Sequence, residues 1–375
     1  MSSTDIRPEV DVIIAVHQLN RPLRRAVLSA LDAGEPGQVR VIVVGHGLAA
    51  GDVWNLLDGC PRDHVVVVSY VDGIRSAAGP FNAGLKLADA EFVCVLGSDD
   101  MLEPGVVGTW VGQARRLGAD AVLAPLKLQS GSLVRTPRLR ALRRPKLDPV
   151  RDRVAYRTAP LGLLRTSTLR DKDLLFTEGL ATGEDVAFSL KLFLPAGVIV
   201  MGRPGQHYVV GEDAQERVTD TRLPLDEEFG AFLALVQDPW FQSLPLRQRR
   251  SVAIKIARIH VIPALLGRGP NWVWAGPDGQ AVQRLLVELD RTAPAFEGPL
   301  CRADRRLLAA ASSYTPGVSG LSAALNRFAG EAPRERLLTA RRRENFLVES
   351  NLRYYVDLKV CRALEGRLPG LINPS

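Results

Sequence analysis

The chain has 375 residues, of which 46% are hydrophobic and 24% are charged. These fractions are those of a globular protein and exclude wholesale disorder, and the length favours two domains over one. The net charge is +7, and residues 226–375 carry +6 of it. Such an excess suits a phosphate-bearing partner or an anionic membrane surface, although it also serves solubility. The sequence contains no zinc finger, recognition helix or basic-aromatic RNA-binding pattern, so we expect no nucleic acid partner.

The cysteines and apolar stretches bear on the compartment. The four cysteines lie far apart and form no CxxC motif, which is typical of reduced thiols. Residues 1–10 contain no apolar core of a secretory signal, and the apolar stretches 190–201 and 251–267 are interrupted by charges or proline. We therefore expect a cytoplasmic protein, with the inner face of the membrane as a peripheral site.

Strand and helix signals alternate in the first half of the chain. Continuous apolar runs predict buried strands at residues 10–16, 39–44, 65–70, 91–96 and 121–125. Between these strands, apolar residues at helical spacing predict helices at 21–33, 51–57, 80–90 and 104–117. This alternation predicts an α/β fold with a mostly parallel central sheet, in which ligands bind beyond the carboxyl ends of the strands.

Helical patterns dominate from about residue 226 onward. We expect helices at 226–237, 246–266, 280–292, 302–312 and, as one long amphipathic segment, 334–364. The sequence therefore predicts two domains, 1–225 and an α-helical domain over 226–375. The helical domain could serve acceptor binding, membrane contact or dimer formation. A basic, proline-punctuated stretch over 135–153 reads as a loop or loose helix.

The strongest local motif is Ser98-Asp99-Asp100, directly after a predicted buried strand. Two carboxylates at the ligand edge of a sheet are unfavourable unless a cation neutralises them, and Mg²⁺ or Mn²⁺ bridging a diphosphate would do so. The alternative is a simple helix N-cap provided by Ser98 or Asp99.

Two further motifs remain ambiguous on their own. Glu184 and Asp185 open a predicted helix, where acids also complement the helix dipole. Gly45-His46-Gly47 begins a GxGxxA pattern, but it follows the second predicted strand rather than the first, so a glycine turn is the better reading than a nicotinamide site.

Taken together, these features resemble the family-2 glycosyltransferases of the GT-A fold. The resemblance covers roughly residues 8–222: the opening VDVIIAV, the N-x-G of Asn82 and Gly84, GSDD at 97–100, and the later Glu184-Asp185 pair. Two features depart from the family pattern. Gly45 and His46 stand where members often carry an acid, and Gly97 stands where the first acid of D-x-D-D would be.

The resemblance implies a role for each matching position. Val16, His17, Gly45 and His46 would hold the nucleotide base, and Ser98 and Asp99 would contact the ribose and the metal. The remaining implied positions are Arg75 and Asn82 near the donor, Asp99, Asp100 and His207 as metal ligands, and Asp185 with Glu184 as the catalytic base.

The implied activity is metal-assisted, inverting transfer of a sugar from a nucleotide diphosphate to a hydroxyl. We expect Mn²⁺ or Mg²⁺, a UDP-sugar as the favoured donor, and a glycan, polyol-phosphate or lipid-linked acceptor of the cell envelope. The C-terminal helices could form a homodimer. The alternative is a binding or scaffold protein of the same fold whose catalysis is impaired by the missing acids.

Overall fold

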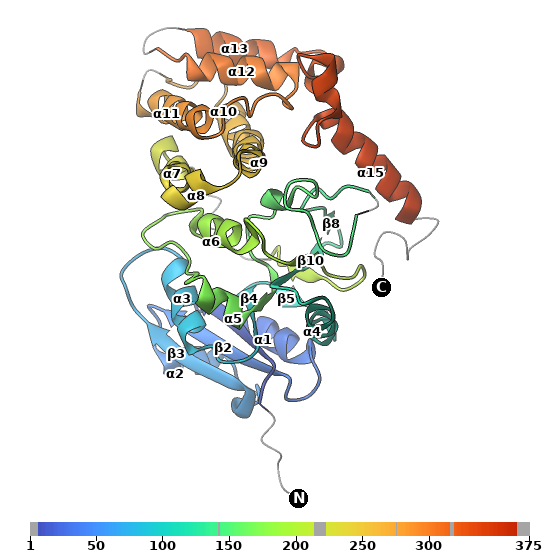
Figure 1. Ribbon diagram of the computed structural model, residues 1–375. Helices are drawn as coiled ribbons and strands as arrows, with labels where there is room; N and C mark the ends of the chain where they lie inside the picture. Colours follow the sequence, from blue (N-terminus) through green and yellow to red (C-terminus); the bar gives the residue numbers. More distant parts are fainter. Residues whose placement is uncertain (1–6, 142, 214–222, 275, 316–318, 366–375) are drawn as a thin grey trace, which may run out of the picture. The chain divides into compact units, whose positions relative to one another are not determined.

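The computed structural model describes residues 7–141, 143–213, 223–274, 276–315 and 319–365. The chain forms two compact units (Figure 1). The first comprises residues 1–136, 145–147 and 157–221, and the second comprises 137–144, 148–156 and 222–375. The second unit thus includes two segments of the basic stretch, which the expected limits of 1–225 and 226–375 did not assign to it.

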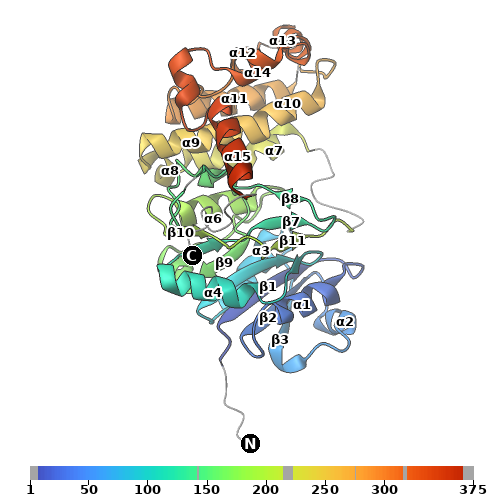
Figure 2. The same cartoon turned by 90° about the vertical axis from the view of Figure 1, so that its right-hand side faces the viewer.

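A seven-stranded sheet forms the centre of the first unit (Figure 2), with the order β10-β6-β9-β4-β1-β2-β3. Its strands are β1 (Val10–Val16), β2 (Val39–His46), β3 (Val65–Tyr70), β4 (Phe92–Gly97), β6 (Ala121–Leu123), β9 (Gly162–Arg165) and β10 (Ile199–Met201). All pairings are parallel except those of β9, which runs antiparallel to both β4 and β6. The expected α/β fold with a mostly parallel sheet is confirmed.

Helices cover this sheet. They are α1 (Leu23–Asp32), α2 (Ala50–Leu56), α3 (Ala78–Leu87), α4 (Val106–Leu117), α5 (Thr166–Asp171) and α6 (Glu184–Phe193), with a short 3₁₀ turn at Arg62–His64. β1, β2 and β4 are buried almost throughout, as their continuous apolar runs predict. Helix α4 begins at Val106 after the left-handed Gly105, so neither Ser98 nor Asp99 caps it. The N-cap alternative for the acidic motif is therefore wrong.

A second, four-stranded sheet contains the segment that follows the acidic motif. Its order is β5-β11-β7-β8, from the strands β5 (Met101–Leu102), β11 (Tyr208–Val210), β7 (Leu126–Leu128) and β8 (Leu133–Val134). β5 and β11 pair antiparallel, with Leu102 opposite Tyr208. Residues 207–213 are consequently brought beside residues 97–103 although about a hundred positions separate them.

The second unit is helical. It contains α7 (Leu225–Gln237), α8 (Pro239–Ser243), α9 (Leu246–Ile256), a π-helical turn (Ala257–Val261), α10 (Ile262–Arg268), α11 (Pro277–Thr292), α12 (Arg302–Ser312), α13 (Gly320–Ala329), α14 (Pro333–Leu337), α15 (Asn351–Glu365), and 3₁₀ turns at Val154–Tyr156 and Arg342–Phe346. In the part of the chain that the structure describes, no helix combines the length and apolarity needed to cross a bilayer.

The prediction of one long helix over 334–364 is wrong. Helix α14 ends at Leu337, because Thr339 turns away to form a β-bridge with Cys301 and donates its N–H to Asn345 Oδ1 at 3.0 Å. Glu349 and Ser350 are then buried at the start of α15. Tertiary contacts thus end a helix that the sequence pattern alone would continue.

Candidate functional site

Three strands of the first unit end at a common edge. The register pairs Val16 with Gly45 and Ala15 with Gly97, so the positions that follow β1, β2 and β4 adjoin one another. Val16 is buried and His17, the next residue, is exposed. This edge is where α/β sheets of this type bind their ligands.

Asp99 is paired with an arginine from the loop after β1. Nη1 of Arg21 lies 3.2 Å from Oδ2 of Asp99, with side-chain exposures of 9% and 20%. Arg25, from the first turn of α1, donates from Nη2 to the backbone carbonyl of Asp99 at 2.7 Å. Two cationic side chains thus hold the acidic motif, and sequence reasoning missed both of them. The signal in the sequence was the place of Arg21 in the loop that follows the first strand, which ends at Val16.

Asp100 is held by the segment 207–213. Its Oδ2 accepts from the Tyr208 hydroxyl at 2.5 Å, and its Oδ1 accepts from the backbone N–H of Gly211 at 2.8 Å. The same hydroxyl accepts from the N–H of Gly97 at 3.0 Å. Burial, and then the Asp100 charge, raise the pKa of Tyr208 well above its ordinary value. Both oxygens of Asp100 are therefore engaged by the protein.

Gly97 explains the absence of the first acid of the motif. A Cβ at this position would lie 2.4 Å from Oδ2 of Asp100, too close for any side chain. An aspartate at 97 is thus incompatible with the observed place of the Asp100 carboxylate. Gly211 is similarly required, since a Cβ there would lie 2.0 Å from the carbonyl oxygen of Asp99.

His207 is oriented by Glu103. Its Nδ1 lies 2.9 Å from Glu103 Oε2, and its backbone N–H donates to the same oxygen at 2.8 Å. Lys127 pairs with the other oxygen of Glu103. Burial acts to raise the pKa of Glu103, but the hydrogen bonds from Lys127 and His207 lower it overall. A carboxylate on Nδ1 leaves Nε2 as the nitrogen able to bind a cation, the usual arrangement of metal-binding histidines.

His46 has an acidic partner from the neighbouring strand. Its Nε2 lies 2.7 Å from Oδ1 of Asp72, and its ring is tilted against Tyr70 with centroids 5.8 Å apart. The backbone N–H of Ile74 and then His46 lower the pKa of Asp72. His46, which stands where family members often carry an acid, is thus paired here with an acid that follows the third strand. Sequence reasoning missed Asp72, and its only signal was the position two residues beyond β3.

The N-x-G motif of α3 has two separate structural roles. Asn82 is buried, donates to the carbonyl of Phe176 at 3.0 Å and to Glu178 Oε1 at 2.9 Å, and accepts from the N–H of Phe176 at 2.8 Å. Gly84 lets α3 approach β1, because a Cβ there would lie 2.3 Å from Cγ2 of Ile13. The described contacts of Asn82 are with the loop before α6, and its expected contact with a donor stays a prediction. Arg75, on the loop between β3 and α3, is exposed.

Glu184 and Asp185 form the first turn of α6, after the left-handed Gly183. The carbonyl of Glu184 accepts from the N–H of Thr177 at 3.0 Å, so the loop held by Asn82 also fixes this turn. Phe176 stacks on Phe188 of α6 with ring centroids 4.4 Å apart. Burial, and then the charge of Asp185, raise the pKa of Glu184.

The structure brings the site residues together in two clusters. One links residues 97–103 with 207–213 and Arg21, and the other links α3 with the loop 174–183 and α6. Helix α3 starts at the edge where β3 ends, since a Cβ on Gly79 would meet Asp72 and Tyr70. Both clusters belong to the first unit, and Figure 1 places α6 on the side of the sheet toward which β4 runs.

The side chains that could act as metal ligands test the expected metal site. Among the described residues no group of three histidine, cysteine, aspartate or glutamate side chains is placed to hold an ion. Mg²⁺ and Mn²⁺ bound to nucleotides, however, usually take one or two protein ligands together with the phosphates. Asp99 alone fits such a partial set, because the β5–β11 register sets His207 opposite Glu103 while Gly211 adjoins Asp99, and Asp100 already has hydrogen bonds on both oxygens.

Comparison with known proteins defines the class. Residues 11–174 match the sequence model of "Glycosyl transferase family 2". The first unit therefore contains a family-2 glycosyltransferase domain, and this confirms the family expected from the sequence.

Two curated relatives cover part of this region. A poly(ribitol-phosphate) beta-glucosyltransferase of Bacillus spizizenii is 22% identical over 45% of this chain and 26% of its own length. The poly(ribitol-phosphate) beta-N-acetylglucosaminyltransferase TarS of Staphylococcus aureus (strain Mu50) is 27% identical over 36% of this chain and 24% of its own length. The matches span about a quarter of each relative.

Solved structures resemble nearly the whole chain. Crystal structures of S. aureus TarS residues 1–349 cover 87% of this chain and 93% of theirs at 17% identity, with TM-scores of 0.71 in complex with UDP-GlcNAc and 0.64 with UDP. At this identity the likeness shows the fold alone: a GT-A domain followed by helices, as predicted.

Proposed function

We propose that the protein is an inverting glycosyltransferase that moves a sugar from a nucleotide diphosphate to a hydroxyl of a phosphate-containing acceptor. The observation that carries the proposal is the pairing of two acidic sites in one domain. Asp99, flanked by Arg21 and Arg25, follows β4, while Glu184 and Asp185 form the first turn of α6. One site suits a diphosphate with its metal, and the other suits proton transfer from an acceptor.

Asp185 is proposed as the general base. It would accept the proton of the acceptor hydroxyl as that oxygen attacks C1 of the sugar from the face opposite the leaving diphosphate. Glu184 would sit beside it, where burial and then the charge of Asp185 raise the pKa of Glu184. Asn82 would act on this step indirectly, through the loop that it holds against α6.

Asp99 is the residue proposed to hold the divalent cation together with the phosphates of the donor, and a role for His207 as a ligand stays a prediction. Mn²⁺ or Mg²⁺ bound there would stabilise the charge that develops on the leaving diphosphate. Arg21 would contribute a second positive charge near the same oxygens. Asp100 is proposed as a support of this site, because Tyr208 and Gly211 already bind its two oxygens.

The donor is proposed to be a UDP-sugar. This rests on the structural likeness to TarS, whose crystal structures contain UDP-GlcNAc or UDP. Val16, His17, Gly45 and the His46–Asp72 pair lie where the base and ribose would bind at the carboxyl edge. Ser98 and Arg75 are proposed as further donor contacts.

The acceptor is proposed to be a polyol-phosphate polymer of the cell envelope. Both curated relatives are named for poly(ribitol-phosphate), and the net charge of +7 suits an anionic polymer. Contact with the membrane surface at the inner face of the membrane is part of this proposal. A homodimer through the C-terminal helices stays a prediction.

Gly97 favours one alternative, a binding or scaffold protein with impaired catalysis, because the first acid of the family motif is absent. The two functions are separated by incubating the protein with UDP-GlcNAc, UDP-glucose or UDP-galactose, with Mn²⁺ and with poly(ribitol-phosphate). Transfer of labelled sugar by the wild-type protein, and its loss in Asp185→Asn, supports the enzyme. Donor binding without transfer or hydrolysis for any of these donors would support the scaffold.

A further inference from the structure

Exposed apolar side chains gather at the C-terminal end of the second unit. Phe346 is 78% exposed, and Leu347, Val356 and Val360 are 44%, 48% and 37% exposed. Isolated surface hydrophobics are ordinary, but a group within fifteen positions of one another marks an interaction surface. We call these four residues, together with Arg342 and Arg343, the basic-apolar face.

Helix α15 contributes two of the exposed apolar side chains of this face. Val356 and Val360 are one helical turn apart and lie on one side, flanked by the exposed Lys359. An adjoining side of the helix is buried through Asp357, whose Oδ2 lies 2.9 Å from Nη2 of Arg153 and whose Oδ1 lies 3.6 Å from Nε of Arg353, and through Cys361. The helix is thus anchored on one side and presents apolar and basic groups on the other.

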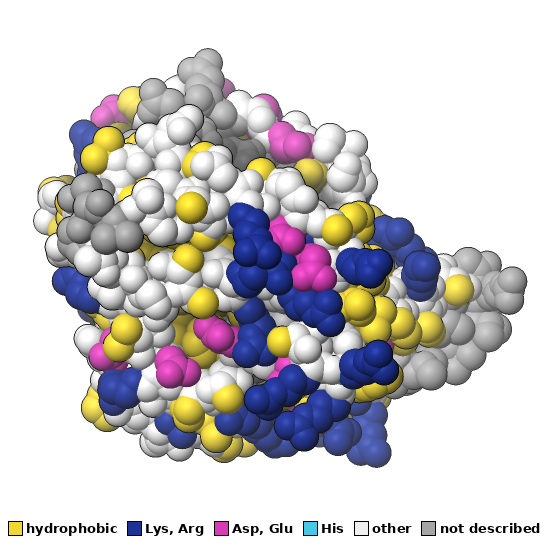
Figure 3. Space-filling view, turned by 90° about the horizontal axis from the view of Figure 1, so that it is seen from above, with side chains coloured by type: hydrophobic (Ala, Val, Ile, Leu, Met, Phe, Trp, Pro, Cys, Tyr) yellow, Lys and Arg dark blue, Asp and Glu magenta, His cyan; other side chains and the backbone are white. Residues whose placement is uncertain are grey.

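The arginines of this face lack acidic partners. No described carboxylate lies within ion-pairing distance of Arg342 or Arg343, although several neighbouring arginines, such as Arg305 and Arg306, are paired with glutamates. Figure 3 shows Lys and Arg side chains gathered toward the side on which α15 lies, with hydrophobic side chains between them. The face therefore offers positive charge that the protein itself does not neutralise.

We propose that the basic-apolar face binds the surface of a membrane that contains anionic lipids. Arginines would contact the headgroups, while Phe346 and the valines of α15 would enter the boundary of the acyl chains. The apolar component favours a membrane over a phosphate polymer, which offers nothing for exposed Phe and Val side chains to bury against. The unneutralised arginines disfavour a second copy, because a symmetric contact would bring like charges together. The proposal refines the membrane contact named above but does not depend on catalysis.

The test is sedimentation of the full-length protein with vesicles. We expect binding to vesicles of 70% phosphatidylcholine and 30% phosphatidylglycerol, weak binding to pure phosphatidylcholine, and release by high salt. The double variant Arg342→Glu/Arg343→Glu should lose at least about 30-fold in affinity, since each basic residue near an anionic surface contributes roughly fivefold. Phe346→Ser should also weaken binding.

Matched controls keep charge and exposure constant. Arg116→Glu/Arg247→Glu makes the same charge change at exposed arginines elsewhere, and Val273→Ser removes an equally exposed apolar residue, 78% accessible. Both controls should bind like the wild type. Equal losses in test and control variants, equal binding to neutral vesicles, or no binding at all would each overturn the proposal.

Two further measurements test whether a second copy of the chain or the acceptor polymer binds this face instead of a membrane. A wild-type dimer in sedimentation velocity that Phe346→Ser converts to a monomer would assign the face to a second copy and overturn the proposal. A selective loss of affinity for soluble poly(ribitol-phosphate) in the double variant, with vesicle binding retained, would assign it to the acceptor. Because vesicle binding is measured without donor, its failure would leave the proposed transferase activity untouched.

Discussion

Arg21 and Asp99 form an ion pair, with 3.2 Å between Nη1 and Oδ2, so the acidic motif after β4 already holds a cation from the loop after β1. A divalent metal that binds Asp99 must compete with this guanidinium for the same carboxylate. Metal binding at Asp99 therefore depends on whether the Arg21 side chain stays paired with that carboxylate.

Removing the competing cation should strengthen metal binding. We expect Arg21→Gln to bind Mn²⁺ about fivefold more tightly in the absence of nucleotide, since a partly exposed ion pair contributes about 1 kcal/mol. Isothermal titration with Mn²⁺ measures this. Arg25→Gln is the comparison variant, because Arg25 reaches Asp99 at its backbone carbonyl and pairs with the carboxylate of Asp213 instead. An equal effect in both variants would indicate a general charge effect instead of the pair.

The base is tested by an isosteric change. Asp185→Asn should reduce turnover at least about 100-fold while leaving donor affinity nearly unchanged, since general-base catalysis contributes about 10²–10⁴-fold. Rapid-quench kinetics and titration with UDP-sugar measure the two quantities separately. Unchanged turnover would end the assignment of Asp185.

Two roles are distinguished for Asn82: it holds the loop before α6, or it contacts the donor directly. If it holds the loop before α6, Asn82→Ala should lower the free energy of unfolding by about 1–3 kcal/mol, because the N–H and carbonyl of Phe176 lose their partner. Turnover should then fall while donor affinity stays within about twofold of the wild type. Urea denaturation and donor titration measure both effects. A variant of wild-type stability with weakened donor binding would instead support direct donor contact.

The raised pKa of Glu184 predicts a pH effect on stability. The folded state binds its proton more tightly than the unfolded state does, so stability declines as pH rises from the ordinary glutamate pKa through the raised folded value. Glu184→Gln removes this loss. We therefore expect the variant to gain in melting temperature relative to wild type at pH 8, and to gain less at pH 4. Calorimetry across this range would contradict the prediction if the difference were independent of pH.

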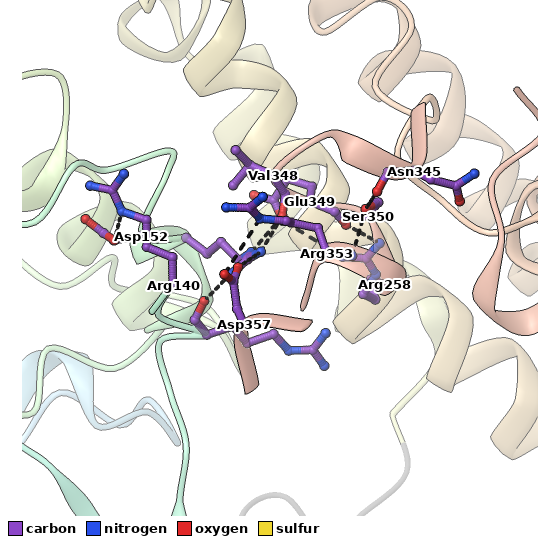
Figure 4. Close-up of polar contacts among 11 residues, drawn as sticks. Arg140, Asp152, Arg258, Asn345, Val348, Glu349, Ser350, Arg353 and Asp357 are labelled. Atoms are coloured by element: carbon purple, nitrogen blue, oxygen red, sulfur yellow. Dashed lines mark hydrogen bonds and ion pairs between the residues drawn. The ribbon is translucent and has the colours of Figure 1, made fainter. Parts of the chain in front are cut away.

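The second unit contains a buried ion pair that is testable on its own. Arg153, 1% exposed, donates to the carbonyl of Val348 at 2.9 Å from Nε and pairs with Asp357, and the same cluster holds Arg140 against Asp152 (Figure 4). Arg153→Met should destabilise the protein by about 3–5 kcal/mol, since Asp357 would remain buried with only its longer contact to the exposed Arg353, at 3.6 Å.

A compensating variant separates charge from packing in this cluster. Arg153→Met/Asp357→Leu should recover much of the stability, because no buried charge is then left unpaired. Urea denaturation followed by tryptophan fluorescence compares the two variants. No recovery in the double variant would show that the contacts of Arg153 with the backbone, and not the ion pair, carry the effect.

The same cluster changes the reading of the basic stretch. Arg138 lies over the rings of Tyr156 and Tyr354, at 5.0 and 4.7 Å from their centroids, and Arg140 pairs with the fully buried Asp152. Arginine side chains such as those of this segment are able to bind phosphates through paired hydrogen bonds. In the structure Arg138 instead packs against Tyr354 of α15, and Arg140 pairs with an acid of the stretch itself.

The sequence by itself determined five strands of the seven-stranded sheet, the family of the domain and the positions of its acidic motifs. Buried parallel strands require continuous apolar runs, and carboxylates directly after such a run are conspicuous without any knowledge of contacts. Only the tertiary structure decided the partners: Asp72 for His46, Arg21 for Asp99, and Tyr208 with Gly211 for Asp100. Each joins residues that are 26 to 111 positions apart. The local sequence pattern does not predict such pairs. Strand register and sheet order decide which side chains of distant segments come into contact. For the same reason the helix expected over 334–364 is broken at Thr339, where a bridge to Cys301 outweighs local helical preference.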